Sequence, residues 1–269
     1  MMISKEAVIT SNINLFGDYY LLEVMAKGIG TKASPGQFFM VKVGSGTDPL
    51  LRRPFGLHKI VSPDSIKMLY RAAGYGTKLL TKMVKGDALN ILGPLGNGFK
   101  VAKDTNHALI VAGGIGVAPM VALAEEIKNS RQDIHVACFI GGRGKDDILG
   151  VNEFRSLGLR VYVSTEDGSL PKKGYVTDPL EQYMSKFEAK GFGGWAIYSC
   201  GPTPMLRSVA AVAARHGIKN FASLEANMAC GIGACMGCVV SVQDMEHGSQ
   251  VYKKVCEDGP VFDAEDVVW

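Results

Sequence analysis

The sequence predicts an α/β plus β fold in three parts: an N-terminal antiparallel β-barrel, a central parallel α/β domain and a small C-terminal domain. Three observations support this prediction. Short β-rich runs separated by glycine and proline fill about the first hundred residues. From about Asn106, continuous apolar runs alternate with helix-like segments. After Phe221 a short cysteine-containing tail follows, so we expect the parts to span residues 1–101, 102–222 and 223–269.

Length and composition exclude several classes of protein. With 269 residues, the chain can bury a core without disulfides. The net charge is +3 and the basic residues are scattered, so no nucleic-acid-binding surface is predicted. The longest uncharged run, 108–124, is shorter than the roughly 20 apolar residues of a membrane span and contains Pro119. The opening "MMISKEAVITSN" lacks a secretory signal, so we expect reduced cysteines and a cytoplasmic location.

The N-terminal part shows strand-like runs such as "YYLLEVMA", "GQFFMVKV" and "SIKMLYRA". Its most informative stretches are "LLRRPFGLHKI" and "LYRAAGYGTKLL". Arg53 and Arg71 could each bind a phosphate through the forked guanidinium group, with Gly74, Gly76 and Thr77 supplying further donors. For either stretch alone, the preferred interpretation is that the arginines merely extend from strand ends into solvent.

The central part predicts a parallel sheet, because the runs "HALIVAG", "IHVACFIGG", "LRVYVSTED" and "WAIYSCGP" show no polar alternation. The turn "VAGGIGVAPM" places Gly113, Gly114 and Gly116 between a strand and a helix, where backbone N–H groups can bind a pyrophosphate. The turn lacks the complete dinucleotide fingerprint, so a tight turn without a ligand is the alternative. A second strand end, with Cys200, Gly201 and Pro202, strengthens the prediction of a dinucleotide crevice.

Four of the six cysteines are candidate ligands of one centre. Four residues separate Cys230 from Cys235, two separate Cys235 from Cys238, and seventeen separate Cys238 from Cys256. This is the spacing of plant-type [2Fe–2S] proteins, and the intervening glycines let a loop wrap closely around a cluster. Structural zinc and ordinary buried thiols are the alternatives. Cys138 lies within an apolar run and is expected to be a core residue.

The motifs together resemble those of the ferredoxin-reductase superfamily. "RRPFG", "YRAAGYGT", "GPLGNGF", "AGGIGVAP" and "SCGPTPM" occur in the order that this superfamily uses. With "MACGIGACMGC" and "VCEDGPVF" appended, the whole chain resembles the iron–sulfur electron-transfer subunits of the NAD-linked, B-type dihydroorotate dehydrogenase family. The resemblance implies that the N-terminal barrel binds FAD, the central domain NAD and the C-terminal domain a [2Fe–2S] cluster.

The resemblance also implies the residues that hold each group. FAD would be held by Arg53, Pro54, Phe55, Gly56, Leu69, Tyr70, Arg71, Gly76 and Thr77, and the cluster by Cys230, Cys235, Cys238 and Cys256. The family's flavin motif commonly ends in serine, whereas this chain has Gly56, so a side-chain contact to the flavin at that position is in doubt.

The implied function is electron transfer in pyrimidine (UMP) biosynthesis. An FMN-containing dihydroorotate dehydrogenase subunit would pass electrons through the cluster and FAD to NAD+, in a heterotetramer with two of each chain. No acid–base catalytic residue is predicted. His58 is the nearest candidate, and the alternative interpretation is that it is a satisfied histidine at the end of a strand, without a catalytic role. One alternative is a flavin and iron–sulfur subunit of a ferredoxin:NADP or sulfide-type oxidoreductase. Another is a non-enzymatic, zinc-containing nucleotide-binding protein.

One cue concerns the choice of nucleotide. "VSTEDGS" ends a predicted strand, and Glu166 and Asp167 there could accept hydrogen bonds from ribose hydroxyls while repelling a 2′-phosphate. The sequence therefore predicts NAD rather than NADP. Solvated acids in a turn are the alternative interpretation.

Overall fold

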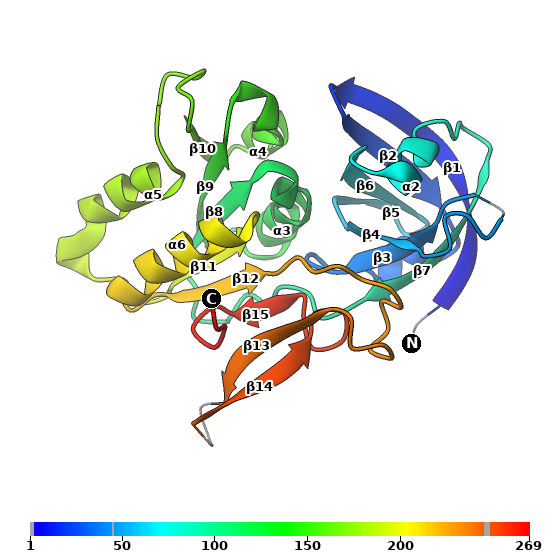
Figure 1. The fold of residues 1–269 in the computed structure, drawn as a ribbon. Helices are drawn as coiled ribbons and strands as arrows, with labels where there is room; N and C mark the ends of the chain where they lie inside the picture. Colours follow the sequence, from blue (N-terminus) through cyan, green and yellow to red (C-terminus); the bar gives the residue numbers. More distant parts are fainter. Residues whose placement is uncertain (1–2, 45, 245–247) are drawn as a thin grey trace.

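The computed structural model describes residues 3–44, 46–244 and 248–269. An N-terminal sheet and a central sheet with helices on both faces lie side by side, and the C-terminal segment runs along both (Figure 1). The N-terminal part contains β1 (Ile3–Phe16), β2 (Tyr19–Met25), α1 (Ile29–Lys32), β3 (Phe38–Lys42), β4 (Arg53–Gly56), β5 (Lys59–Ser62), β6 (Ser65–Arg71), α2 (Tyr75–Leu80) and β7 (Ala88–Leu95).

The N-terminal strands form one antiparallel sheet in the order β4-β3-β7-β1-β2-β6-β5. The predicted antiparallel β-barrel takes the form of a curled sheet that does not close, because β4 and β5, the two edges, are not paired with each other in the described part of the chain. They are consecutive in sequence, and Leu57 and His58 carry the chain from one edge to the other. The backbone N–H of Leu57 donates to Gln37 on the β3 side, and that of His58 donates to Lys67 on β6, each over 2.9 Å. The sheet is therefore strongly curled but remains open.

The central part is the predicted parallel α/β domain. Its strands are ordered β10-β9-β8-β11-β12, all parallel. Its elements are β8 (His107–Gly113), α3 (Val117–Ser130), β9 (His135–Gly142), α4 (Val151–Ser156), β10 (Arg160–Thr165), α5 (Thr177–Met184), β11 (Trp195–Cys200), α6 (Thr203–Arg215) and β12 (Lys219–Ser223), with the 3-10 turns η1 (Gly114–Gly116), η2 (Lys145–Asp147) and η3 (Ser185–Lys190).

Both faces of this sheet are buried, which explains its continuous apolar strands. Along β8, Ile110 packs on the face covered by α3 and α4, whereas Leu109 and Val111 pack on the face covered by α5 and α6. Figure 1 shows these two pairs of helices on opposite sides of the sheet. All five parallel strands consequently end at one edge, where an open α/β sheet binds its ligands.

The C-terminal segment is joined to both preceding parts. It forms a two-stranded ribbon of β13 (Val239–Asp244) and β14 (Ser249–Lys254), followed by β15 (Val261–Asp263). β15 pairs antiparallel with β12 and thereby extends the central sheet. A shared apolar core unites Phe38 and Met40 of β3, Leu206 of α6 and Val255. The predicted fold class is thus confirmed, while the bounds of the three domains stay predictions.

Candidate functional site

Two adjoining cavities lie where the N-terminal and central sheets meet. The larger has a volume of about 830 Å³ and lies over the ends of β8, β9 and β11. The smaller, of about 330 Å³, lies between the N-terminal sheet and the start of α3. Arg71, Ile115 and Glu225 line both cavities, so the two spaces are neighbours. The larger volume is within the range of sites for small molecules and cofactors.

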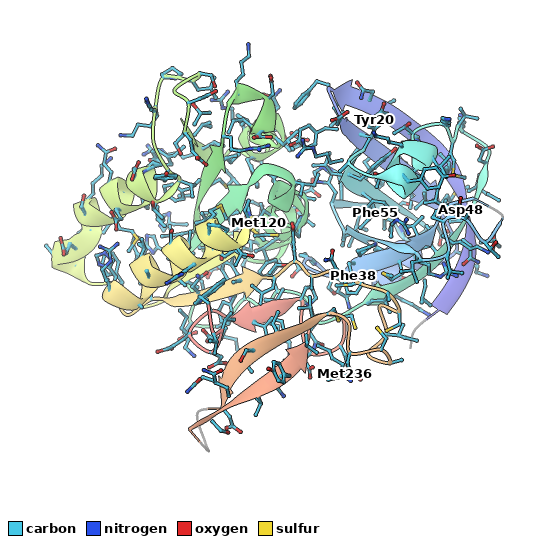
Figure 2. All side chains as sticks on the ribbon, in the orientation of Figure 1. Tyr20, Phe38, Asp48, Phe55, Met120 and Met236 are labelled. Atoms are coloured by element: carbon cyan, nitrogen blue, oxygen red, sulfur yellow. The ribbon has the colours of Figure 1, made fainter. Side chains whose placement is uncertain are left out.

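The smaller cavity collects most residues of the predicted flavin site. Pro54, Phe55 and Gly56 of β4, Leu69, Tyr70 and Arg71 of β6, and Thr77 of α2 line it. The rings of Phe55 and Tyr70 meet edge to face with centroids 5.5 Å apart, which gives the cavity a fixed aromatic wall. Figure 2 shows Phe55 within the N-terminal sheet and Met120 across the junction, on α3.

Arg53 and Gly76 lie beside this cavity rather than among the residues that line it. A Cβ atom on Gly76 would stand 2.6 Å from Arg53 Nε, so only glycine lets the guanidinium lie along the start of α2. The Arg53 guanidinium also donates to the Leu51 carbonyl. The structure therefore brings the two predicted phosphate-binding stretches together.

The glycine-rich turn after β8 borders both cavities and also packs against the end of β11. Gly113 and Gly114 line the larger cavity, whereas Gly116 and Cys200 line the smaller one. Gly114 has φ of +53° and open space where a Cβ would stand, whereas a Cβ on Gly116 would lie 2.4 Å from the Cys200 carbonyl oxygen. This close approach of two strand ends requires glycine at position 116.

The second strand end lies beside the same turn. Of the residues predicted there besides Cys200, Pro202 lines the larger cavity, whereas Gly201 is not among the residues that line either cavity.

Glu225, which the sequence analysis missed, is the acidic side chain shared by both cavities. Enclosure by the cavity walls raises its pKa. It lies near the buried Cys200, whose pKa is raised to about 12 by burial and further by the negative charge of Glu225. The available signal was its place just after the strand "NFAS", at the ligand-binding edge of the sheet.

The two acids predicted to select the nucleotide are separated by the structure. Glu166 lines the larger cavity. Asp167 turns back on its own loop, where it accepts a hydrogen bond from the Ser169 backbone N–H over 2.8 Å. Of these two acids, Glu166 therefore faces the larger cavity and Asp167 does not.

His58 and Cys138 have structural surroundings. His58 is buried, with Nδ1 3.2 Å from the Ala118 carbonyl oxygen, and burial lowers its pKa. It is not among the residues that line either cavity. Cys138 lies fully buried in β9, where burial raises its pKa. Both positions fit the core interpretations given above.

The four candidate cysteines lie on one loop and on the turn after β14. Gly231 and Gly233 have φ of +71° and +80°, which bends the loop tightly. Backbone N–H groups point at the sulfurs: Ile232 donates to Cys230 Sγ over 3.4 Å, and Gly233 donates to Cys256 Sγ over 3.1 Å. N–H groups directed at sulfur stabilise thiolate ligands.

The sulfurs associate in two pairs. The Cys235 side chain is hydrogen-bonded to Cys230, and the Cys238 side chain to Cys256. Burial would raise the pKa of Cys230, but hydrogen bonds from the Ile232 backbone, from the Cys235 thiol and from nearby backbone N–H groups lower it to about 7. Burial and then the Cys238 thiol raise the pKa of Cys256 to about 12. Across the described ranges, no three His, Cys, Asp or Glu side chains are arranged as the ligands of a single metal ion.

Two segments of the chain match models of known protein families. Residues 225–268 match the family model described as the iron–sulfur cluster binding domain of dihydroorotate dehydrogenase B. Residues 110–211 match the oxidoreductase NAD-binding domain. A dihydroorotate dehydrogenase B (NAD(+)) electron transfer subunit of Bacillus mycoides is 38% identical over 271 residues, covering 100% of each chain. One of Desulforamulus reducens is 36% identical, covering 93% of this chain and 92% of that protein.

The chain belongs to the family of dihydroorotate dehydrogenase B electron transfer subunits. The family expected from the sequence motifs is thereby confirmed, as is the expectation of an oxidoreductase subunit. This member of the dihydroorotate dehydrogenase B family carries an NAD-binding region followed by an iron–sulfur binding region.

Solved structures share the fold of almost the whole chain. The structure of an NADH-dependent reduced ferredoxin-NADP oxidoreductase, studied for flavin-based electron bifurcation, superposes with a TM-score of 0.81 at 26% identity, covering 98% of this chain and 90% of that one. A ferredoxin NADP+ reductase from Neisseria gonorrhoeae shares the fold alone, with a TM-score of 0.66 at 16% identity, covering 80% of this chain and 92% of that one. Within the described residues of this dihydroorotate dehydrogenase B family member, no helix has the length and apolar character needed to cross a bilayer.

Proposed function

We propose that this chain passes electrons from the FMN of a dihydroorotate dehydrogenase catalytic subunit, through a [2Fe–2S] cluster and FAD, to NAD+ in pyrimidine (UMP) biosynthesis. The observation that carries the proposal is the contiguity of three sites: the cysteine loop, the smaller cavity and the larger cavity. Leu224, Glu225, Ala226 and Met228 line the smaller cavity and lead directly into the cysteine loop. When bound, the cofactors supply the redox chemistry, and the protein sets their distance and orientation.

The smaller cavity fits a flavin. A flat ring system would lie between the β4 and β6 walls, where Phe55 and Tyr70 supply apolar faces. Arg53 and Thr77 stand at the end nearest α2, where charged and hydroxyl donors suit a pyrophosphate. In the described part of the chain Arg53 makes no ion pair with an acidic side chain, so its charge is available to a ligand.

The larger cavity fits a nicotinamide dinucleotide. Gly114 leaves its floor open beside the start of a helix, whereas Gly113 packs closely against Pro202 and Met205, which form a wall of the cavity. Arg71, Ile115 and Glu225 lie at the boundary with the flavin cavity. A nicotinamide bound over these strand ends would adjoin that boundary.

The cysteine loop fits a two-iron cluster better than a single zinc ion. A [2Fe–2S] cluster takes four cysteine thiolates. The pairing of Cys230 with Cys235 and of Cys238 with Cys256 would suit two irons, each held by two of these thiolates, whereas tetrahedral zinc needs all four sulfurs around one point. The cluster ligands must stay reduced, so this proposal includes a reducing compartment and hence the cytoplasm.

The partner and stoichiometry belong to this proposal. Ile232 and Met236, on the cysteine loop, are 41% and 54% exposed, and Figure 2 shows Met236 at the outer surface of the molecule. Exposed apolar side chains beside a redox centre suit a protein partner. We expect an FMN-containing catalytic subunit there, in an assembly with two copies of each chain.

The test is isolation of the native complex followed by absorption spectroscopy and identification of the bound partner. We expect flavin bands, the broad absorbance of an iron–sulfur centre and a co-purified dihydroorotate dehydrogenase subunit. A second arm replaces Cys235 by alanine, which should abolish transfer from the partner while FAD remains bound. A colourless, zinc-containing protein would contradict the proposal.

A second candidate function follows from one observation, the likeness over almost the full chain to the NADH-dependent reduced ferredoxin-NADP oxidoreductase. The chain would then keep the same cofactors but serve a ferredoxin-linked partner. Co-purification of a different large subunit, together with ferredoxin-dependent reduction of nucleotide, would select this function.

A further inference from the structure

The outer end of the larger cavity carries side chains with opposite preferences for a nucleotide. Glu166 follows β10 and Arg143 follows β9, and both line the cavity. Their backbones are joined: the Glu166 N–H donates to the Gly142 carbonyl and the Asp167 N–H donates to the Arg143 carbonyl, each over 3.0 Å. An acidic side chain at such a place suits a ribose 2′-hydroxyl, whereas an arginine accommodates a 2′-phosphate. These two neighbours therefore favour different dinucleotides.

Arg143 is already engaged by a third residue of the cavity. Its Nε donates to Asp147 Oδ2 over 3.1 Å. Asp147 Oδ1 in turn accepts a hydrogen bond from the Tyr19 hydroxyl over 3.0 Å. Tyr19 belongs to β2, so a residue of the N-terminal sheet holds the Asp147 carboxylate from across the junction. Each carboxylate oxygen of Asp147 thus accepts one hydrogen bond, one from Arg143 beside the central sheet and one from Tyr19 of the N-terminal sheet.

The surroundings keep Asp147 charged and in place. Its side chain is only 18% exposed, whereas that of Arg143 is 73% exposed. Burial would raise the pKa of Asp147, but hydrogen bonds from Tyr19 and Arg143 and the positive charge of Arg143 lower it. The Arg71 guanidinium, opposite Tyr19 in the pairing of β2 with β6, lies 5.7 Å from the centre of the Tyr19 ring and supports that ring.

We propose that Asp147 determines the preference for NAD over NADP by holding Arg143 in an ion pair, so that Arg143 does not serve as a 2′-phosphate ligand. The inference rests on the proposed function, in which the larger cavity binds the dinucleotide. Asp147 acts as a positioning residue, while Glu166 contributes direct repulsion of a 2′-phosphate. A 2′-phosphate would have to compete with a carboxylate that is anchored from both sheets.

The experiment compares Asp147→Asn with Asp146→Asn in the purified complex. Asparagine keeps an oxygen that can accept from Tyr19 but removes the charge that holds Arg143. Asp146 is exposed and is not among the residues that line the cavity, so it is the matched control. The measurements are calorimetric titrations with 5′-AMP and with adenosine 2′,5′-bisphosphate, and separate kcat and KM values for NADH and NADPH.

We expect Asp147→Asn to tighten binding of the bisphosphate relative to 5′-AMP by about tenfold, the effect of one charge-assisted contact to phosphate. The change should appear as a lower KM for NADPH rather than as a change of kcat. Asp146→Asn should keep the natural ratio. If the natural protein prefers 5′-AMP and Asp147→Asn leaves the ratio of bisphosphate affinity to 5′-AMP affinity unchanged, the inference is overturned.

A second variant keeps the test decisive if Asp147→Asn does not fold. Arg143→Ala in the natural background should leave the bisphosphate-to-AMP ratio unchanged, because the ion pair already removes Arg143 from recognition. A loss of bisphosphate binding in Arg143→Ala would show that Arg143 contacts the 2′-phosphate, and would refute the role of Asp147. If neither fragment binds the natural protein, the proposed nucleotide site itself is wrong.

Discussion

At the residue scale, Gly56 marks the departure of this chain from the usual flavin motif. Its position has room for a side chain: a Cβ there would meet only Pro119 Cδ, at 3.9 Å. The absence of a hydroxyl is therefore not a steric requirement, and the cavity wall at β4 can accept serine.

We predict that Gly56→Ser leaves the melting temperature close to that of the natural protein and shifts the reduction potential of the bound flavin, because a new hydroxyl lines the cavity. The control is Gly93→Ser on β7, where a Cβ would lie 2.5 Å from Phe39 Cδ1. Crowding there should cost about 1–3 kcal/mol of stability. Equal destabilisation by the two variants would contradict this account.

Glu225 connects the stability of the fold to pH. Its pKa is raised in the folded protein by enclosure, so the native state binds more protons than the unfolded chain. Stability from this group is therefore present at low pH and is lost as pH rises from the ordinary glutamate pKa through the raised one. Stability therefore changes with pH in the opposite direction from that produced by an ion-paired carboxylate.

We predict that Glu225→Gln becomes more stable relative to the natural protein as pH rises across that window, with a constant difference above it. Melting temperatures measured from acidic to neutral pH would show the effect, and replacement of the exposed Glu188 by glutamine provides the matched control. A difference that shrinks with rising pH would mean that Glu225 has a favourable charged partner.

At the scale of elements, the turn between β8 and α3 depends on two glycines for different reasons. We predict that Gly116→Ala mainly lowers stability, because its Cβ would lie 2.4 Å from the backbone of β11. Gly114→Ala should cost about 1 kcal/mol through its left-handed conformation and should mainly weaken NADH binding, because its open side faces the larger cavity. Denaturant unfolding and the KM for NADH separate the two effects.

At the scale of the whole molecule, the apolar surface of the cysteine loop predicts how the partner binds. Ile232→Glu should abolish co-purification of the catalytic subunit while iron content is retained, because a charge would be buried in the interface. Val84→Glu is the matched control, since Val84 is 62% exposed and follows α2, away from the loop. Loss of the partner in both variants would point to general destabilisation.

The parts of this molecule that depend on local pattern were predictable from the sequence. The cysteine spacing, the glycine turn and the apolar strands each lie within a short window, and the structure forms the expected elements there. The contact of Tyr19 with Asp147 spans 128 residues and follows from the docking of two sheets, so no local pattern indicates it. The open edge at Leu57 and His58 likewise depends on the curl of the whole sheet.

The pairing of β15 with β12 has a consequence for the modularity of the chain. The chain leaves the central sheet at Ser223 and returns to its neighbour at Val261, and the Leu224 N–H already bonds to the Pro260 carbonyl over 2.8 Å. The intervening cysteine-bearing stretch is thus an excursion with adjacent ends. A short connector in its place would leave β12 and β15 as an ordinary hairpin, so the central sheet would keep its edge, whereas the smaller cavity would lose the wall that Leu224, Ala226 and Met228 supply.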